Sequence, residues 1–105
     1  MLYNEKWDVK PVIESKPLEL WRQRLLGAAQ ILRTSGWCQK HYYVGETSCL
    51  VGAIRRSCQT AIGAQEPLNM VKDFLGYSPV VWNDMSGRTK EQVINLLETV
   101  AKKGL

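Results

Sequence analysis

Four residues of the chain have side chains suited to nucleophilic catalysis: Cys49, His41, Asn83 and Asp84. A thiol beside a helix N-terminus has its thiolate stabilised by the helix dipole, and an imidazole with an amide or carboxylate can deprotonate and orient it. No nucleophile-elbow or protease-type signature surrounds Cys49, so we interpret its thiol as a small hydrophobic group that packs. We expect no catalytic residue, and an enzyme centred on Cys49 is the alternative.

The candidate metal ligands are three cysteines and one histidine: Cys38, His41, Cys49 and Cys58. Cys38 and His41 have the close spacing that zinc ligands use. Cys49 and Cys58 are nine positions apart on one predicted helix, beyond the gap of about two to four residues that lets a pair hold one ion. We therefore expect no metal, and the sequence indicates no cofactor.

A basic surface with neighbouring aromatic residues gives the strongest indication of function in the sequence. Arginine forks suit phosphates, and aromatic faces suit bases. Residues 16–64 carry seven Lys or Arg against two Glu, a net charge of +5, whereas residues 65–105 carry five charges of each sign. The candidate ligand-binding residues are Arg22, Arg24, Arg33, Trp37, Tyr42, Tyr43, Arg55, Arg56 and Arg88.

This charge suits a compact anion better than a long nucleic acid. Five excess charges on two helices are few for a protein that follows an extended DNA backbone, and no helix-turn-helix or RNA-binding signature accompanies them. The sequence favours a non-catalytic binding protein that holds a small phosphorylated ligand, as a nucleotide-signal sponge would, or inhibits a partner protein. A plain nucleic-acid-binding protein is a further alternative.

The composition bounds the class of protein. A chain of 105 residues with 45% apolar residues suits one globular domain. No run approaches the roughly 20 apolar residues of a membrane span, and the N-terminal residues lack the apolar centre of a signal peptide. An odd number of cysteines leaves at least one thiol unpaired in a monomer, so we expect a cytoplasmic protein. Leu20 and Ile31 lie off the first apolar stripe, which indicates a second contact, either within the chain or between subunits. We expect a homo-oligomer.

The elements that position these residues are mainly helical. Residues 1–15 predict an extended arm, and residues 16–105 one helical domain, a compact bundle of about four helices with at most a small two- or three-stranded β element. Capping residues, glycines and 3.6-residue apolar spacing set the boundaries. The same spacing predicts that Leu18, Leu50, Ile54 and Leu97 lie on buried helix faces and that Arg55 and Arg56 point outward. The predicted helices run from Ser15 to Thr34, Ser48 to Gly63, Pro67 to Gly76, and Thr89 to Gly104, with short strands at 42–44 and 80–82.

Three segments of the chain carry a resemblance to a known family. In order they are LLGAAQILRTSGW (25–37), CLVGAIRRS (49–57), and VVWND followed by GRTKEQVINLLETVA (80–101). This order resembles DUF6197, a bacterial and phage family of unknown function, over roughly residues 18–103. The matching positions are Ala28, Gly36, Trp37, Cys49, Gly52, Ala53, Trp82, Asn83, Asp84, Gly87, Arg88 and Thr89. The resemblance implies the domain boundaries and a cytoplasmic or phage setting, and it implies no chemistry.

Overall fold

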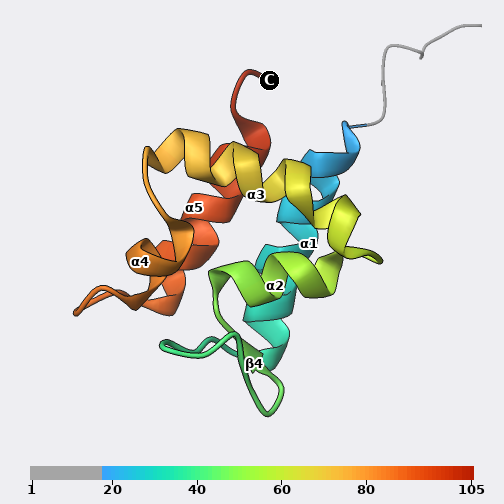
Figure 1. Ribbon diagram of the computed structural model, residues 1–105. Helices are drawn as coiled ribbons and strands as arrows, with labels where there is room; N and C mark the ends of the chain where they lie inside the picture. The colour runs from blue at the N-terminus through green and yellow to red at the C-terminus, as the bar shows by residue number, and fades with distance from the viewer. Residues whose placement is uncertain (1–17) are drawn as a thin grey trace, which may run out of the picture.

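The computed structural model describes residues 18–105, which form five helices and one two-stranded antiparallel sheet (Figure 1). In chain order the elements are α1 (Leu20–Ser35), β3 (Tyr43–Val44), β4 (Thr47–Ser48), α2 (Leu50–Ser57), α3 (Ala61–Leu75), α4 (Pro79–Asp84) and α5 (Lys90–Lys102). The predicted mainly helical class with a small β element is confirmed. The predicted arm, residues 1–15, and the predicted cap Ser15 lie outside the described residues.

The core forms around α1, which contacts both α2 and α5 extensively. Its small residues Ala28 and Ala29 are fully buried, and they let the neighbouring helices approach closely. Leu50 of α2 and Leu97 of α5 are likewise fully buried, as the apolar spacing predicts. In Figure 1, α2 lies in front of α1 and α3 crosses the upper part of the molecule. The helical faces predicted to point inward therefore meet in one core.

The starts of the first and last helices can be compared with those predicted from their capping residues. The predicted α5 is confirmed, because Thr89 and Gln92 form a reciprocal capping box at its start. The start predicted for α1 is too early: the helix begins at Leu20, with Glu19 as its N-cap. Leu18, predicted to lie on the buried face, precedes the helix and is exposed. The capping signals thus located the start of α5 correctly and placed the start of α1 too early.

The boundary between α2 and α3 differs from the prediction. The N-cap of α2 is Cys49 rather than Ser48, and the helix ends at Ser57. Gly63 does not end a helix but lies in the first turn of α3, where its N–H donates to the Thr60 side chain at 2.9 Å. Pro67 lies inside α3, although it removes one N–H from the helix ladder. Burial of Ala64, Pro67 and Val71 on one face of the helix offsets that loss.

The buried strand predicted at residues 80–82 is wrong, because this segment forms the short helix α4. Ser78 accepts a hydrogen bond from Val81 N at 3.4 Å, and Pro79 occupies the first turn, where its missing N–H costs nothing. Val80 and Val81 are 36% and 55% exposed. The β-branched pair that suggested a buried strand therefore lies on the surface of a helix.

The predicted strand at 42–44 is confirmed as the two-residue strand β3, which pairs with β4 in the register Tyr43↔Ser48 and Val44↔Thr47. Trp37 forms a further bridge to Ser48. The loop of residues 36–48 is thereby held against the start of α2. Across residues 18–105, no helix has the length and apolar character needed to cross a bilayer.

Candidate functional site

Asn83, at the end of α4, connects three segments that are far apart in the sequence. Its Oδ1 accepts hydrogen bonds from Trp37 Nε1 at 2.7 Å and from Leu50 N at 3.0 Å. Its Nδ2 donates to Cys38 O at 3.3 Å and to Asp84 Oδ1 at 2.9 Å. The side chain is fully buried. Asn83 therefore ties the loop of residues 36–48 and the start of α2 to α4, and its amide has little capacity left for a ligand.

Gly52 lets the loop that carries Tyr42 lie directly on the first turn of α2. A Cβ atom at Gly52 would clash with the Tyr42 carbonyl oxygen, which accepts a hydrogen bond from Cys49 N at 3.0 Å. The conflict is with backbone, so a larger residue could enter only if the loop moved. The close approach places the Tyr42 side chain beside Cys49.

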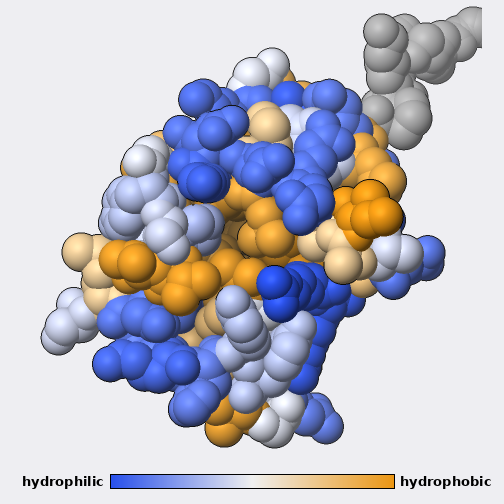
Figure 2. Space-filling model, in the orientation of Figure 1, coloured by the Kyte–Doolittle hydropathy of each residue, from blue (hydrophilic) through white to orange (hydrophobic). Residues whose placement is uncertain are grey.

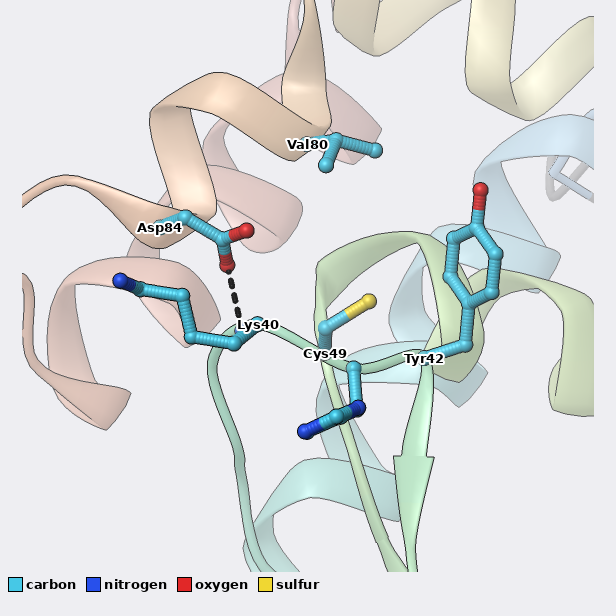
Figure 3. A pocket seen from close by; sticks show the side chains of 6 residues that line it. Lys40, Tyr42, Cys49, Val80 and Asp84 are labelled. Atoms are coloured by element: carbon cyan, nitrogen blue, oxygen red, sulfur yellow. Dashed lines mark hydrogen bonds between the residues drawn. The ribbon is translucent and has the colours of Figure 1, made fainter.

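A cavity of about 350 Å³ opens above Cys49, and we call it the thiol cavity (Figure 3). Figure 3 shows the Cys49 sulfur directed into the space between Tyr42 and Val80, with Asp84 at the opposite side from Tyr42. The lining residues are Lys40, His41, Tyr42, Cys49, Val80 and Asp84. Three of the four catalytic candidates thus line one cavity, and the fourth, Asn83, is engaged next to it.

The Cys49 thiol serves as the N-cap of α2. Its Sγ accepts a hydrogen bond from Gly52 N at 3.3 Å, and the residue is 4% exposed. Burial raises the pKa of the Cys49 thiol above its ordinary value, and it outweighs the hydrogen bonds from backbone N–H groups, which lower it. At neutral pH the group is therefore a protonated thiol, which is a weak nucleophile.

Native-state alkylation tests this assignment. At neutral pH, Cys49 should react with iodoacetamide at least about tenfold more slowly than Cys58, because burial limits both access and thiolate formation. Cys58 ends the same helix, is half-buried, and serves as the internal control. Peptide mass spectrometry after timed quenching measures both rates in one sample. Faster labelling at Cys49, with a midpoint below the free-thiol pKa of about 8.5, would contradict the assignment.

Asp84 supplies an ionised carboxylate to the thiol cavity. Burial works to raise the pKa of Asp84, but hydrogen bonds from Lys40 N and the Asn83 side chain outweigh it and hold the pKa below its ordinary value. Both of these bonds end on Oδ1, each at 2.9 Å. Among residues 18–105, Oδ2 has no hydrogen-bond donor, and in Figure 3 the second carboxylate oxygen lies on the cavity side. The cavity therefore offers one charged acceptor to a ligand.

Three of the candidate arginines connect elements of the fold. Arg22 is 9% exposed, donates to Ala101 O at 3.0 Å and Lys103 O at 2.6 Å, and pairs with Glu19. Arg33 forms an ion pair with Glu98 of α5. Arg88 lies 3.8 Å from the centre of the Trp82 ring and donates to Trp82 O at 2.9 Å. The structure does not bring these three side chains together at one surface.

Arg55 and Arg56 project outward from the last turn of α2, as predicted, and each lies over one of the candidate tyrosines. The Arg55 guanidinium is 4.8 Å from the centre of the Tyr42 ring, and that of Arg56 is 4.4 Å from Tyr43. Arg56 also donates to Glu46 O at 2.6 Å. Arg55 has no hydrogen bond or ion pair within the described part of the chain, so its donors remain open.

A second cavity, of about 370 Å³, lies where α2 ends and α3 begins; we call it the α2–α3 cavity. Arg55, Gln59, Thr60 and Ala61 are among its lining residues. Arg24 reaches the same turn, because its Nη1 lies 3.5 Å from the position of a Cβ atom on Gly63. That Nη1 atom is buried, and within residues 18–105 it has no hydrogen-bond acceptor.

Sequence reasoning identified Arg55, which lines this cavity, and Arg24, which lies beside it, but it missed the lining residues Gln59 and Thr60. The signal that could have found them is the cap itself, since Thr60 stands three positions before Gly63 and caps α3. The cap at Thr60 was not recognised because the helix was predicted to start at Pro67. Figure 2, in the orientation of Figure 1, shows hydrophobic surface in a hollow near the centre of this view, with hydrophilic surface above and below it.

The candidate metal ligands do not assemble. Within residues 18–105 no three His, Cys, Asp or Glu side chains are grouped so that they could hold an ion. Cys38, Cys49 and Cys58 are all free cysteines. The Cys38 thiol donates a hydrogen bond to the main-chain carbonyl oxygen of His41 at 3.4 Å.

The comparison with known proteins agrees with the resemblance seen in the sequence. The model of DUF6197, described as a family of unknown function, matches residues 19–103. The chain therefore belongs to this family. No curated protein and no solved structure matches it. The residues that carry the family resemblance include Trp37, Cys49, Gly52 and Asn83, which hold the loop of residues 36–48 against α2 and α4.

Proposed function

We propose that this DUF6197 member is a non-catalytic binding protein that holds a compact phosphorylated ligand at the α2–α3 cavity. The observation that carries the proposal is Arg55, which lines this cavity and has no hydrogen bond or ion pair from its side chain within residues 18–105. Within the same residues the ion pairs are Arg22–Glu19 and Arg33–Glu98, so neither Arg55 nor the nearby Arg24 has a carboxylate partner. Arg55 therefore offers open donors to a concave, polar site, and Arg24 holds a buried, unpaired donor behind the same turn.

The energetics of Arg24 favour an anion at this position. A buried donor without an acceptor costs about 1–3 kcal/mol, and more when it is charged. Arg55 offers a fork of donors to a phosphate in the cavity, and the positive charge of Arg24 lies behind the same turn. A phosphate oxygen would supply the missing acceptor to Arg24 Nη1 once that side chain turned toward the cavity. The first turn of α3 adds a partial positive charge and contains no acidic residue that would repel the ligand. Compact phosphates match this arrangement better than an extended polyanion.

The setting and assembly form part of the same proposal. The protein works in the cytoplasm, where reducing conditions keep Cys38, Cys49 and Cys58 as thiols. It assembles as a homo-oligomer through exposed apolar side chains such as Leu20, which is 59% exposed. A bacterial or phage sponge that sequesters a nucleotide signal is one role that such a site could serve.

Titration with inorganic phosphate tests the site. Arg55→Gln and Arg24→Gln should each raise the dissociation constant about tenfold or more, because a hydrogen bond to a charged group contributes about 1.5–3 kcal/mol. Arg33→Gln is the matched control: it removes the same charge from α1 at an arginine that pairs with Glu98. NMR chemical shifts report binding, and thermal melts report whether each variant is folded.

Two outcomes would overturn the proposal. One is the absence of saturable phosphate binding to the folded wild-type protein. The other is a loss of affinity in Arg33→Gln as large as that in Arg55→Gln, since the affinity would then follow net charge rather than this cavity.

A further inference from the structure

We propose that the phosphorylated ligand is a nucleotide whose base occupies the thiol cavity while its phosphate occupies the α2–α3 cavity. This inference rests on the proposed function, and it adds a second subsite with its own chemistry. The preferred base is guanine, because the thiol cavity offers an open carboxylate oxygen to the N–H groups of a base edge.

The two cavities lie at opposite ends of one short helix. Cys49, the N-cap of α2, lines the thiol cavity, and Cys58, its C-cap, lines the α2–α3 cavity. A helix of eight residues is about 12 Å long. A small molecule that carries a base at one end and a phosphate at the other can extend over a distance of this order, so a polymer is not needed to reach both cavities.

Arg55 connects the two cavities. The residue lines the α2–α3 cavity, and its guanidinium lies 4.8 Å from the centre of the Tyr42 ring, which lines the thiol cavity. One side chain therefore lines the first cavity and stacks on a lining residue of the second. A ligand that extends from one to the other passes along a cation that has no ion-pair partner within residues 18–105.

The walls of the thiol cavity suit a flat heterocycle. Tyr42 presents an aromatic ring, which is 45% exposed, and Val80 presents an apolar wall. Proteins that take up a single base commonly hold it between aromatic and apolar side chains and read its hydrogen-bonding edge. The cavity volume of about 350 Å³ lies within the range of small-molecule sites, about 300–1,000 Å³.

Asp84 selects the base by the hydrogen-bond donors that the base presents. The carboxylate is ionised, so it only accepts hydrogen bonds, and Oδ2 has no donor among residues 18–105. Figure 3 shows the amino end of Lys40 directed away from the cavity, where it does not occupy this oxygen. The Watson–Crick edge of guanine presents two adjacent N–H groups, whereas that of adenine places a ring-nitrogen acceptor beside its amino group. Oδ2 has two lone pairs, so it can accept hydrogen bonds from both guanine N–H groups, whereas adenine offers it one donor beside a repelling lone pair. The carboxylate therefore favours guanine.

The test compares guanosine monophosphate, adenosine monophosphate and inorganic phosphate by calorimetric titration of the full chain. We expect the guanine nucleotide to bind about tenfold more tightly than the adenine nucleotide, and more tightly than phosphate alone. Asp84→Asn should abolish the preference for guanine and leave the affinity for inorganic phosphate unchanged. Asp73→Asn, which removes one negative charge from exposed α3 surface, is the control and should retain the preference.

The outcomes separate the two proposals. Equal affinities of the wild-type protein for both nucleotides and for inorganic phosphate would overturn the base subsite and leave the phosphate site standing. Binding of neither nucleotide nor phosphate would overturn both. Because the comparison of the three ligands uses only the wild-type protein, it decides the matter even where Asp84→Asn fails to fold.

Discussion

Asn83→Leu should lower the free energy of unfolding by about 2–6 kcal/mol, because it leaves two N–H groups without acceptors at about 1–3 kcal/mol each. These groups are Leu50 N, which is buried, and Trp37 Nε1, which is partly buried. Leucine has a similar volume but no polar atom, so it cannot replace either bond. A loss of this size is a large share of the roughly 5–15 kcal/mol that stabilises a domain. Chemical denaturation monitored by tryptophan fluorescence measures it.

The control for this change is Asn95→Leu. Asn95 is exposed on α5, and surface substitutions usually change stability by less than about 0.5 kcal/mol. The pair separates the loss of buried hydrogen bonds from the general effect of adding an apolar side chain. Similar unfolding midpoints for Asn83→Leu and the wild type would show that Asn83 does not hold the three segments together.

Ile54→Asp should abolish folding, because it places an unpaired charge in the core. Ile54 is fully buried, and an isolated carboxylate there must either lose its hydration or take up a proton, both at high cost. The expected result is a far-UV circular dichroism signal that lacks the helical minima and shows no cooperative transition on heating. The neighbouring exposed position supplies the comparison.

Arg55→Glu is that comparison. It reverses a charge one residue away, on the outer face of the same helix, and Arg55 has no hydrogen bond within residues 18–105 that the change would break. Its melting temperature should stay close to that of the wild type while phosphate binding is lost. A folded Ile54→Asp protein, or an unfolded Arg55→Glu protein, would mean that the orientation of α2 is wrong.

Two helix boundaries were predicted correctly from signals that lie within one turn of the chain. Thr89 and Gln92 satisfy each other's main-chain N–H groups, so the start of α5 is encoded in four consecutive residues. Gly76 ends α3 in the left-handed conformation that glycine adopts without strain. Such boundaries depend little on the rest of the fold.

The elements predicted wrongly depend on distant packing. Val80 and Val81 have a high β propensity, but among residues 18–105 this segment pairs with no strand and forms a helix that presents Asn83 to the core. Pro67 usually opens a helix, yet here it lies within α3, because its burial with Val71 outweighs one missing hydrogen bond. Propensity is a weak preference, and tertiary contacts override it.

For the candidate site, the sequence by itself determined which chemical groups are present: the thiol of Cys49, the carboxylate of Asp84, and an excess of arginine in residues 16–64. Side-chain chemistry and net charge are properties of composition, so they need no fold. The 3.6-residue period also placed Ile54 inward and Arg55 outward, because one helix face settles that choice.

Only the tertiary structure decided which of these groups meet. Asp84 and Cys49 line one cavity because Asn83 bonds Leu50 N across 33 positions of the chain. Arg22, by contrast, lies in the first turn of α1 and is engaged by main-chain carbonyl oxygens near the C-terminus. Hydrogen bonds between distant segments leave no periodic trace in a single sequence, and these bonds separate the arginines that hold the fold together from those left free for a ligand.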